Sequence, residues 1–249
     1  MSIHSQAESY AKIADSYARG RPEYPAEMIS WMKRLTGVGA GDVVVDLGAG
    51  TGKFTRSLVN LGLRVTAIEP VDEMRAQLSA MLPEVSAVGG VAQHLEAESA
   101  SADLCTCAQS FHWFADEVAV AEIARVLKPG HFLVLVWNQR DVSNPIQLTL
   151  EEFLLRYQDP EIPHSPNRRW KPVIDGSNLF EFVEETRFTH VHELDGEGVI
   201  DRLRSMSVYS SLSLEIQQEA TEQIRALVPP SGLVGLPYFS EAFAYRRVI

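Results

Sequence analysis

The 249-residue sequence predicts a doubly wound α/β fold with a mostly parallel, seven-stranded, Rossmann-like sheet. Short apolar runs alternate with helix-period segments from residue 43 to residue 137, which is typical of right-handed βαβ units. A glycine-rich turn joins the first apolar run to the first helical segment, the place where ligands bind in open α/β sheets. Two later segments, 182–194 and 237–248, also predict strands and bring the expected number of strands to seven.

The first strands of the sheet, with the helices that connect them, are expected soon after residue 42. The apolar run 43–47 predicts a strand that is buried on both faces. The next segment carries apolar residues at positions i, i+4 and i+7 and ends at Gly62, which predicts an amphipathic helix with a glycine cap. Residues 64–68 predict the next strand, and Asp72 is placed to cap the helix that follows.

The second half of the sheet shows the same alternation. A short strand is expected at 85–88 and a longer one at 103–108. Asp116 begins a helix with a continuous apolar stripe, and Lys128-Pro129-Gly130 ends it. Residues 132–137 then predict another buried strand.

The regions that flank this alternation differ in character. Residues 1–36 predict an N-terminal helical lid, in which Pro25 suits a first helical position. Residues 41–140 predict the ligand-binding core, and the proline-rich residues 141–180 predict a helical and irregular cap insertion. Residues 181–249 add strands and helices that complete the sheet. No clean linker separates these parts, so we expect a single domain with insertions.

Composition restricts the class of function. The sequence has 33 acidic and 22 basic residues, a net charge of −11, which disfavours broad binding to nucleic acid. The polar start lacks a secretory signal and the longest apolar run, 132–137, is far too short to cross a membrane, so a cytoplasmic location is expected. Cys105 and Cys107 are expected to be small core residues on the same face of the sheet, and not metal ligands. No metal is expected, and the oligomeric state stays open.

The turn after the first strand, residues 46–53, reads Asp-Leu-Gly-Ala-Gly-Thr-Gly-Lys. A phosphate-binding P-loop needs a glycine and a hydroxyl where this chain has Leu47 and Phe54, so that interpretation fails. A dinucleotide fingerprint finds its first two glycines here but has Lys53 at the third position. This mismatch weakens the prediction of a nicotinamide-dependent oxidoreductase, which remains an alternative.

The same turn matches the pattern D/E-x-G-x-G-x-G at every position, and the sequence here resembles the class I methyltransferases. The resemblance implies S-adenosylmethionine as the cofactor of the core. Its methionyl part carries an ammonium and a carboxylate but no phosphate. Asp46 would lie near the ammonium, directly or through water, and the glycine backbone would pack against the methionyl chain. The turn residues assigned to the cofactor are Gly48, Ala49, Gly50, Thr51 and Gly52.

Further cofactor contacts are expected from the second and third strands. Glu69 ends the second strand about 20 residues after the glycines, where a carboxylate can accept both ribose hydroxyls, and Pro70 follows it. Met74 is a candidate for the adenine edge, although its helical spacing favours core packing. Residues 90–95 resemble the family segment G-x-A-E-x-L, which implies that Ala92 and Gln93 flank the adenine. Gln93 replaces a common glutamate, and an amide can still donate or accept there.

The strand tip after residue 108 carries a more specific signature. Residues 109–114 resemble the A-F-H-W-F segment of a methyltransferase type 11 subgroup that includes trans-aconitate methyltransferase-like proteins, and Gln109 is assigned to the cofactor site. The leading segment, with Tyr17 and Arg21-Pro22-Glu23-Tyr24-Pro25, resembles that subgroup too. The resemblance covers about residues 7–141, and it implies that Tyr17 and Arg21 close over the cofactor.

Methyl transfer from a sulfonium is an in-line displacement, so catalysis consists mainly of placing the nucleophile opposite the leaving sulfur. His112 is a candidate base for a hydroxyl or amine, or a structural residue, and Trp113 is a candidate wall of a dry pocket. Arg140, Arg168 and Arg169 are candidates to hold an acidic substrate. We expect a small-molecule acceptor, a carboxylate or hydroxyl compound. A non-catalytic regulatory protein that binds the cofactor is the second alternative.

Overall fold

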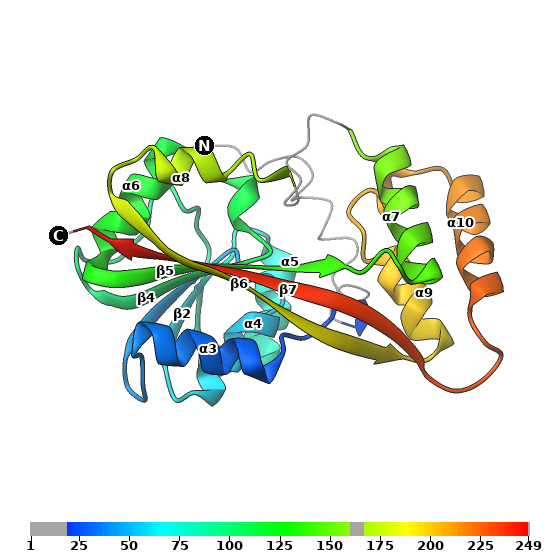
Figure 1. Cartoon of the computed structure of the whole chain (residues 1–249), viewed down its shortest axis with the longest axis horizontal. Coiled ribbons are helices and arrows are strands. Elements are labelled where there is room, and N and C mark those ends of the chain that lie inside the picture. Colours follow the sequence, from blue (N-terminus) through cyan, green and yellow to red (C-terminus); the bar gives the residue numbers. More distant parts are fainter. Residues whose placement is uncertain (1–18, 160–166, 249) are drawn as a thin grey trace. The chain divides into compact units, whose positions relative to one another are not determined.

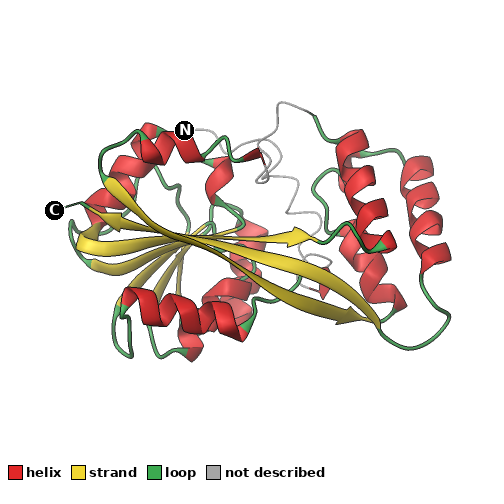
Figure 2. Cartoon of the chain, in the orientation of Figure 1, coloured by secondary structure: helices red, strands yellow, loops and turns green. Residues whose placement is uncertain are grey.

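The computed structural model describes residues 19–159 and 167–248 (Figures 1 and 2). The fold is as predicted, a seven-stranded sheet with helices on both faces. The strands are β1 (Val43–Leu47), β2 (Arg64–Ile68), β3 (Ser86–Val88), β4 (Ala102–Ala108), β5 (Leu127–Arg140), β6 (Phe180–Leu194) and β7 (Val234–Arg247). The α-helices are α3 (Ala26–Thr36), α4 (Lys53–Asn60), α5 (Asp72–Met81), α6 (Glu117–Val126), α7 (Pro145–Tyr157), α8 (Lys171–Asp175), α9 (Gly196–Arg204) and α10 (Leu214–Leu227), and the 3₁₀ turns are η2 (Phe111–Trp113) and η4 (Tyr209–Ser211).

The sheet has the strand order β3-β2-β1-β4-β5-β7-β6. The pairs β1–β2, β1–β4, β2–β3 and β4–β5 are parallel, and the arrows in Figure 1 show β7 running against its neighbours. The chain moves outward from β1 to β3 and then returns to the other side of β1 with β4. The carboxyl ends of β1 and β4 therefore border the point where the strand order reverses, which is where open α/β sheets bind ligands.

Alternation along the buried strands explains how the sheet packs. In β1, Val44 belongs to one apolar cluster, whereas Val45 and Leu47 belong to the other. Helices α3, α4 and α5 cover the first face and α6 and α8 the second (Figure 1). Cys105 and Cys107 are fully buried in the second cluster, which confirms that they are core residues. Burial raises the pKa of the Cys105 thiol to about 12.

Strand β5 begins earlier than the sequence predicts. Ala102 of β4 pairs with Leu127 of β5, and the next pair along the strands is Leu104 with Phe132. Five residues of β5 thus match two of β4, and Gly130, with a φ of 77°, lies inside this irregularity. The Lys-Pro-Gly sequence therefore follows the end of α6 and forms a bulge within the strand.

Two compact units make up the chain. Among the described residues, the sheet unit comprises 24–137, 167–188 and 240–248, and the helical unit comprises 19–23, 138–159 and 189–239. Within the helical unit, α10 packs against α7 and α9, and the three helices share an apolar cluster that includes Leu150, Leu203 and Tyr238. The stretch 141–180, expected as one cap, is divided between the units, because α7 belongs to the helical unit and α8 to the sheet unit.

The start of the described chain is held against α9 in the helical unit. A Cβ on Gly20 would lie 2.6 Å from the backbone nitrogen of Arg202, so a larger residue does not fit there. Most of the first helix of the expected lid lies outside the described residues. Its second helix is α3, in which Pro25 is the N-cap and precedes the first helical position by one residue, because its ψ of 143° is extended.

Candidate functional site

The glycine-rich turn lies between β1 and α4. Its three glycines, Gly48, Gly50 and Gly52, have φ angles of 66°, 59° and 87°, a left-handed conformation that other residues rarely adopt. The backbone N–H groups of Gly48 and Ala49 donate to the carbonyl oxygen of Ile68 at 2.8 and 3.1 Å. The turn is thereby fixed to the end of β2.

The glycines differ in what surrounds them. A Cβ on Gly48 would lie 2.5 Å from the Cβ of Ser110, and a Cβ on Gly52 would lie 3.0 Å from a side chain of α5. A Cβ on Gly50 would meet Met74 Sδ as its nearest neighbour in the described chain, at 4.0 Å. Gly48 and Gly52 are therefore required by protein packing. Gly50 instead faces space that the described side chains leave open, where a ligand could approach the backbone.

Glu69 connects this turn to β2. Its side chain is buried, and Oε2 accepts a hydrogen bond from the N–H of Gly50 at 2.8 Å while Oε1 accepts one from the N–H of Val71 at 2.9 Å. Burial raises the pKa of Glu69, and the two backbone hydrogen bonds and Arg75 oppose that rise. Each carboxylate oxygen can accept a further hydrogen bond. Glu69 thus holds the turn and keeps acceptor capacity for ligand hydroxyls.

Asp46 is 1% exposed and lies directly before the turn. Its Oδ2 accepts a hydrogen bond from Thr55 Oγ1 at 2.7 Å, and its Oδ1 accepts one from Thr106 Oγ1 at 2.8 Å. Burial raises the pKa of this carboxyl to about 6, although the two hydroxyl groups act in the opposite direction. Asp46 therefore joins β1 to α4 and β4, and above about pH 6 it places a negative charge beside the turn.

The other predicted residues around the turn occupy three different environments. Thr51 is 1% exposed, and its hydroxyl has no hydrogen-bond partner in the described chain. A buried hydroxyl without a partner is unfavourable, and a bound ligand can supply one. Met74 is buried in α5, and its side chain packs in the core and also borders the open side of Gly50. Pro70 is half-buried between β2 and α5.

The charges at this edge of the sheet favour one class of ligand. Asp46 and Glu69 lie at the carboxyl ends of the adjacent strands β1 and β2, and their carboxylates interact electrostatically. Negative charge on Asp46 favours a cationic ligand group over a phosphate beside the turn, and Glu69 can accept hydrogen bonds from ligand hydroxyl groups.

The residues expected near an adenine lie on the loop after β3. Ala92 is buried, and Gln93 is half-buried. The amide of Gln93 donates from Nε2 to Asp116 Oδ2 at 2.9 Å. The other oxygen of Asp116 caps α6 by accepting from the N–H of Ala119 at 2.7 Å. Gln93 thus braces its loop against the start of α6.

Strand β4 ends in a residue with a left-handed backbone. Gln109 has a φ of 61°, and its N–H donates to the carbonyl of Val136 at 2.8 Å. The hydroxyl of Ser110 donates to the carbonyl of Leu47 at 2.6 Å, which ties the tip of β4 to the tip of β1. A non-glycine residue in this conformation costs about 1–3 kcal/mol. Gln109 thus forms a strained turn at the tip of β4, beside the glycine turn.

A tryptophan sets the protonation pattern of His112. The indole Nε1–H of Trp137 donates to Nδ1 of His112 at 3.1 Å. Because an indole nitrogen can only donate, Nδ1 is the acceptor, and the proton of the neutral imidazole is on Nε2. The ring of Trp113 lies 4.9 Å from the imidazole, and Trp137 stacks on Trp170 at 4.7 Å.

Two predicted site residues, Arg21 and Arg140, belong to the helical unit, and Tyr17 lies outside the described residues. Arg21 donates from Nη2 to the carbonyl of Ser205 at 2.9 Å. Arg140 forms an ion pair with Glu151. Contacts within the helical unit thus engage both described arginines.

The remaining predicted arginines are in the sheet unit. Arg168 pairs with Glu185 at 2.7 Å, and its guanidinium lies 4.9 Å from the centre of the Phe243 ring. Arg169 is exposed. Arg168 therefore has a structural role between strands and the segment before α8.

Sequence reasoning missed the hydrogen-bond partners of the predicted residues. Thr106 faces Asp46 in the parallel register of β1 and β4, so an alignment of the two strands could have indicated that contact. Thr55 approaches Asp46 from α4, and Trp137 approaches His112 from the end of β5. Those two contacts depend on helix and strand packing that no local pattern shows.

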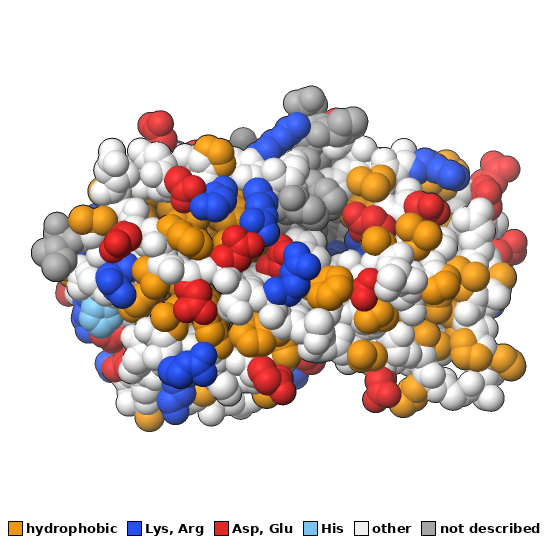
Figure 3. All heavy atoms as spheres, in the orientation of Figure 1, with side chains coloured by type: hydrophobic (Ala, Val, Ile, Leu, Met, Phe, Trp, Pro, Cys, Tyr) orange, Lys and Arg blue, Asp and Glu red, His pale blue; other side chains and the backbone are white. Residues whose placement is uncertain are grey.

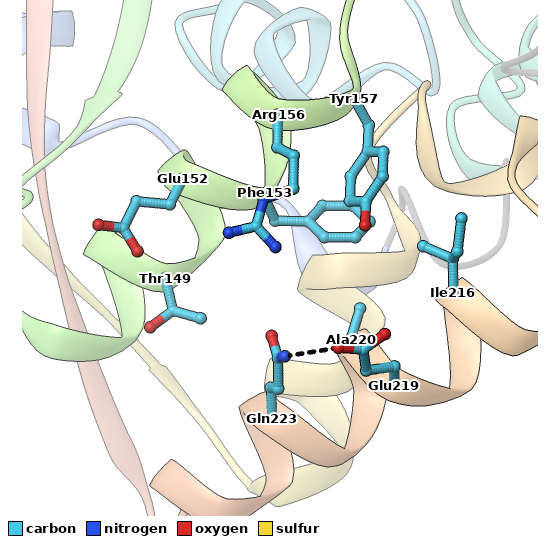
Figure 4. A pocket seen from close by; sticks show the side chains of 9 residues that line it. All are labelled: Thr149, Glu152, Phe153, Arg156, Tyr157, Ile216, Glu219, Ala220 and Gln223. Carbon is cyan, nitrogen blue, oxygen red and sulfur yellow. Dashed lines mark hydrogen bonds between the residues drawn. The ribbon is translucent and has the colours of Figure 1, made fainter.

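The helical unit has a surface hollow between α7 and α10 (Figure 4). It is lined by Thr149, Glu152, Phe153, Arg156, Tyr157, Ile216, Glu219, Ala220 and Gln223. None of the predicted site residues is among them. The hollow is therefore separate from the site at the glycine turn.

In the part of the chain that the structure describes, no group of three or more His, Cys, Asp or Glu side chains is arranged to hold a metal ion. No helix there is long and apolar enough to cross a membrane. On the face drawn in Figure 3, acidic and basic side chains are interspersed.

Comparison with known proteins identifies the family. Residues 45–135 match the family described as a methyltransferase domain. An uncharacterized methyltransferase from Mycobacterium tuberculosis is 34% identical over 223 residues, which cover 88% of this chain and 85% of that protein.

Solved structures show the same fold. A protein described as a type II methyltransferase from Anaeromyxobacter dehalogenans has a TM-score of 0.69 at 20% identity and covers 92% of this chain and 98% of its own. Geranyl diphosphate methyltransferase, solved in complex with SAM, has a TM-score of 0.53 at 16% identity, and the match covers 89% of this chain and 85% of that one. The matched domain, the relative that extends over most of both chains and the shared fold lead to one conclusion: the chain belongs to the class I methyltransferases.

Proposed function

We propose that this methyltransferase binds S-adenosylmethionine at the glycine turn and transfers its methyl group to a small acceptor, a carboxylate or hydroxyl compound. The observation that carries the proposal is the hydrogen bond from Gly50 to Glu69, because it joins the turn to the carboxylate expected to bind ribose. The solved complex of geranyl diphosphate methyltransferase with SAM shares the fold of this chain and supports the choice of cofactor.

The residues present fit this cofactor. The open side of Gly50 leaves room for a ligand, and the buried hydroxyl of Thr51 lacks a partner in the described chain. Glu69 would accept the ribose hydroxyls through its remaining lone pairs, and the charge of Asp46 would favour the ammonium. Pro70, Met74, Ala92, Gln93 and Gln109 would border the nucleoside.

When bound, S-adenosylmethionine supplies a methyl group on a positively charged sulfur. The chain has to hold the acceptor in line with that group and exclude water. His112, at the tip of β4, would donate its Nε2–H to an oxygen of the acceptor, and Trp113 would form an apolar wall. This role agrees with a carboxylate acceptor, which needs no base.

Two alternative functions can be distinguished from the proposed one. A nicotinamide-dependent oxidoreductase is disfavoured by Lys53 in the turn and by the buried carboxylate of Asp46. A non-catalytic protein that binds the cofactor would keep the turn and Glu69 but turn over no acceptor. Binding separates the first alternative from the proposal, and turnover separates the second.

The test is transfer of a radiolabelled methyl group from S-adenosylmethionine to a panel of small acids, small hydroxyl compounds, tRNA and an intact protein. We expect label in at least one small acid or hydroxyl compound and none in tRNA or protein. Efficient labelling of tRNA or protein alone would contradict the proposed acceptor class. Cofactor binding with no transfer to any small compound would favour the non-catalytic alternative.

A further inference from the structure

The helical unit contains a group of three arginines, Arg21, Arg140 and Arg202, which we call the arginine cluster. Arg202 is on α9 and is 2% exposed, and the side chain of Arg140, at the end of β5, is 10% exposed. Arg21 and Arg202 meet at Ser205, because Arg21 donates to its carbonyl at 2.9 Å and Arg202 to its hydroxyl at 3.0 Å. Positive charge is thus concentrated inside a chain whose net charge is −11.

Arg202 is buried with neutral partners. Its Nε donates to the hydroxyl of Tyr238 at 2.8 Å and its Nη1 to the hydroxyl of Ser205. Among residues 19–159 and 167–248 it contacts no carboxylate, although Asp201 precedes it and pairs with Arg19 and Arg204. A buried guanidinium without a counter-charge is costly, and an anion that contacts it would remove most of that cost.

The arginines act on one another and on Tyr238. Burial lowers the pKa of Arg202 to about 9, and the charges of Arg140 and Arg21 contribute to the decrease. Burial alone would raise the pKa of the Tyr238 hydroxyl, but Arg202 and Arg140 hold it below its ordinary value. Both effects indicate a positive potential around the phenol.

Buried polar atoms in the cluster and beside it lack hydrogen-bond partners in the described chain. Among them are Nε of Arg140, a donor in the cluster, and Oε1 of Gln147, a neighbouring acceptor on a side chain that is 0% exposed. The amide nitrogen of Gln147 is satisfied, because it donates to the carbonyl of Pro237 at 2.8 Å. The ion pair of Arg140 with Glu151 leaves that Nε unused. The unsatisfied donor carries the charge that pairs with an oxyanion.

We propose that the arginine cluster binds the oxyanion group of a small acidic ligand, a carboxylate or a phosphate. A guanidinium presents paired N–H donors that match both groups. The inference goes beyond the proposed function, because it concerns anion binding within the helical unit and does not depend on methyl transfer. Anion binding itself can be measured without the cofactor.

The test is calorimetric titration of the full chain at low salt with succinate and, separately, with inorganic phosphate. We expect saturable binding of at least one anion, and the stronger of the two identifies the group. Arg140→Gln and Arg202→Lys should weaken that binding by roughly tenfold or more, because each removes guanidinium hydrogen bonds to a charged group. Arg204→Gln is the matched control, since it removes a more exposed arginine of the same helix, and it should bind like the wild type.

Circular dichroism and titration with S-adenosylmethionine establish that each variant is folded. If neither anion binds to the wild type, or if Arg140→Gln and Arg202→Lys bind as tightly as Arg204→Gln, the arginine cluster is only a structural network and the inference fails. Binding of S-adenosylmethionine without anion binding would reject this inference alone. Anion binding without S-adenosylmethionine binding would reject the proposed cofactor and leave the anion site in place.

Discussion

The carboxylate of Glu69 accepts a hydrogen bond from the backbone N–H of Gly50 at 2.8 Å, across 19 positions of sequence. This contact joins the tip of β2 to the middle of the glycine turn. A second hydrogen bond, from the N–H of Val71 at 2.9 Å, fixes the other oxygen of the same carboxylate. Glu69 is therefore oriented before any ligand binds, so the free energy of binding does not include the entropic cost of ordering this side chain.

Replacement of Glu69 by alanine is expected to weaken binding of S-adenosylmethionine by about 1–3 kcal/mol, since charged hydrogen bonds to the ribose are lost. Calorimetry measures the change. Glu73→Ala is the matched control, because it removes an exposed carboxylate from the adjoining helix α5 and should leave affinity unchanged. Equal affinities for Glu69→Ala and the wild type would place the ribose elsewhere.

Replacement of Gly50 by alanine is expected to abolish binding of the cofactor, because the new Cβ occupies the space beside the turn. The same change forces a left-handed φ on alanine, which costs about 1–2 kcal/mol of folding stability. Gly37→Ala controls for that cost, since Gly37 has a φ of 74° and no neighbour within 4 Å of a Cβ. Both variants should lose similar stability in urea unfolding. If both also bind the cofactor normally, Gly50 does not face the ligand.

The buried carboxyl of Asp46 should make stability depend on pH. Its pKa is raised from 3.8 to about 6, so the native state holds this proton more tightly than the unfolded state does. Between about pH 4 and pH 6 unfolding releases the proton, and the free energy of unfolding therefore falls as the pH rises. Asp46→Asn should remove this dependence, which amounts to about 3 kcal/mol over the window.

Urea unfolding of the wild type and Asp46→Asn at several pH values measures that difference. Affinity for S-adenosylmethionine should also increase as the pH rises through about 6 in the wild type, because ionised Asp46 attracts the ammonium, and it should stay level in Asp46→Asn. Parallel pH profiles of the two proteins, in stability and in binding, would show that Asp46 does not titrate in this range.

The hydrogen bond from Trp137 to His112 predicts the tautomer of the imidazole. Nitrogen-15 NMR of the wild type should show the proton of neutral His112 on Nε2, and Trp137→Phe should give a mixture of tautomers. Trp137→Phe should lower kcat with little change in cofactor affinity. Trp170→Phe is the control, since it removes a similar volume from the same stack and leaves the hydrogen bond intact. A proton on Nδ1 in the wild type would contradict the assignment.

Much of the sheet unit could be predicted because its signals are local. Buried parallel strands such as 43–47 are apolar throughout, and the glycine spacing at 48–52 follows from the backbone conformation that the turn requires. The bulge at Gly130 was missed, because a Lys-Pro-Gly sequence that ends a helix is equally compatible with an irregular strand start.

The contacts that define the site depend on packing between distant segments. Thr55 and Thr106 satisfy Asp46 from two different elements, and Arg202 gains its surroundings only when α9 packs beside Tyr238. Arg202 has no sequence feature that separates it from Arg204, the half-buried arginine of the same helix. Such residues become recognisable once burial and hydrogen bonding are known, because only then is an unpaired charge evident.

The most direct test of the central claim is calorimetric titration of the wild type with S-adenosylmethionine, S-adenosylhomocysteine and NADH under the same conditions. The account predicts binding of the first two in the micromolar range, loss of that binding in Gly50→Ala, and no heat with NADH. Clear binding of NADH, with no heat from either sulfur nucleoside, would contradict it.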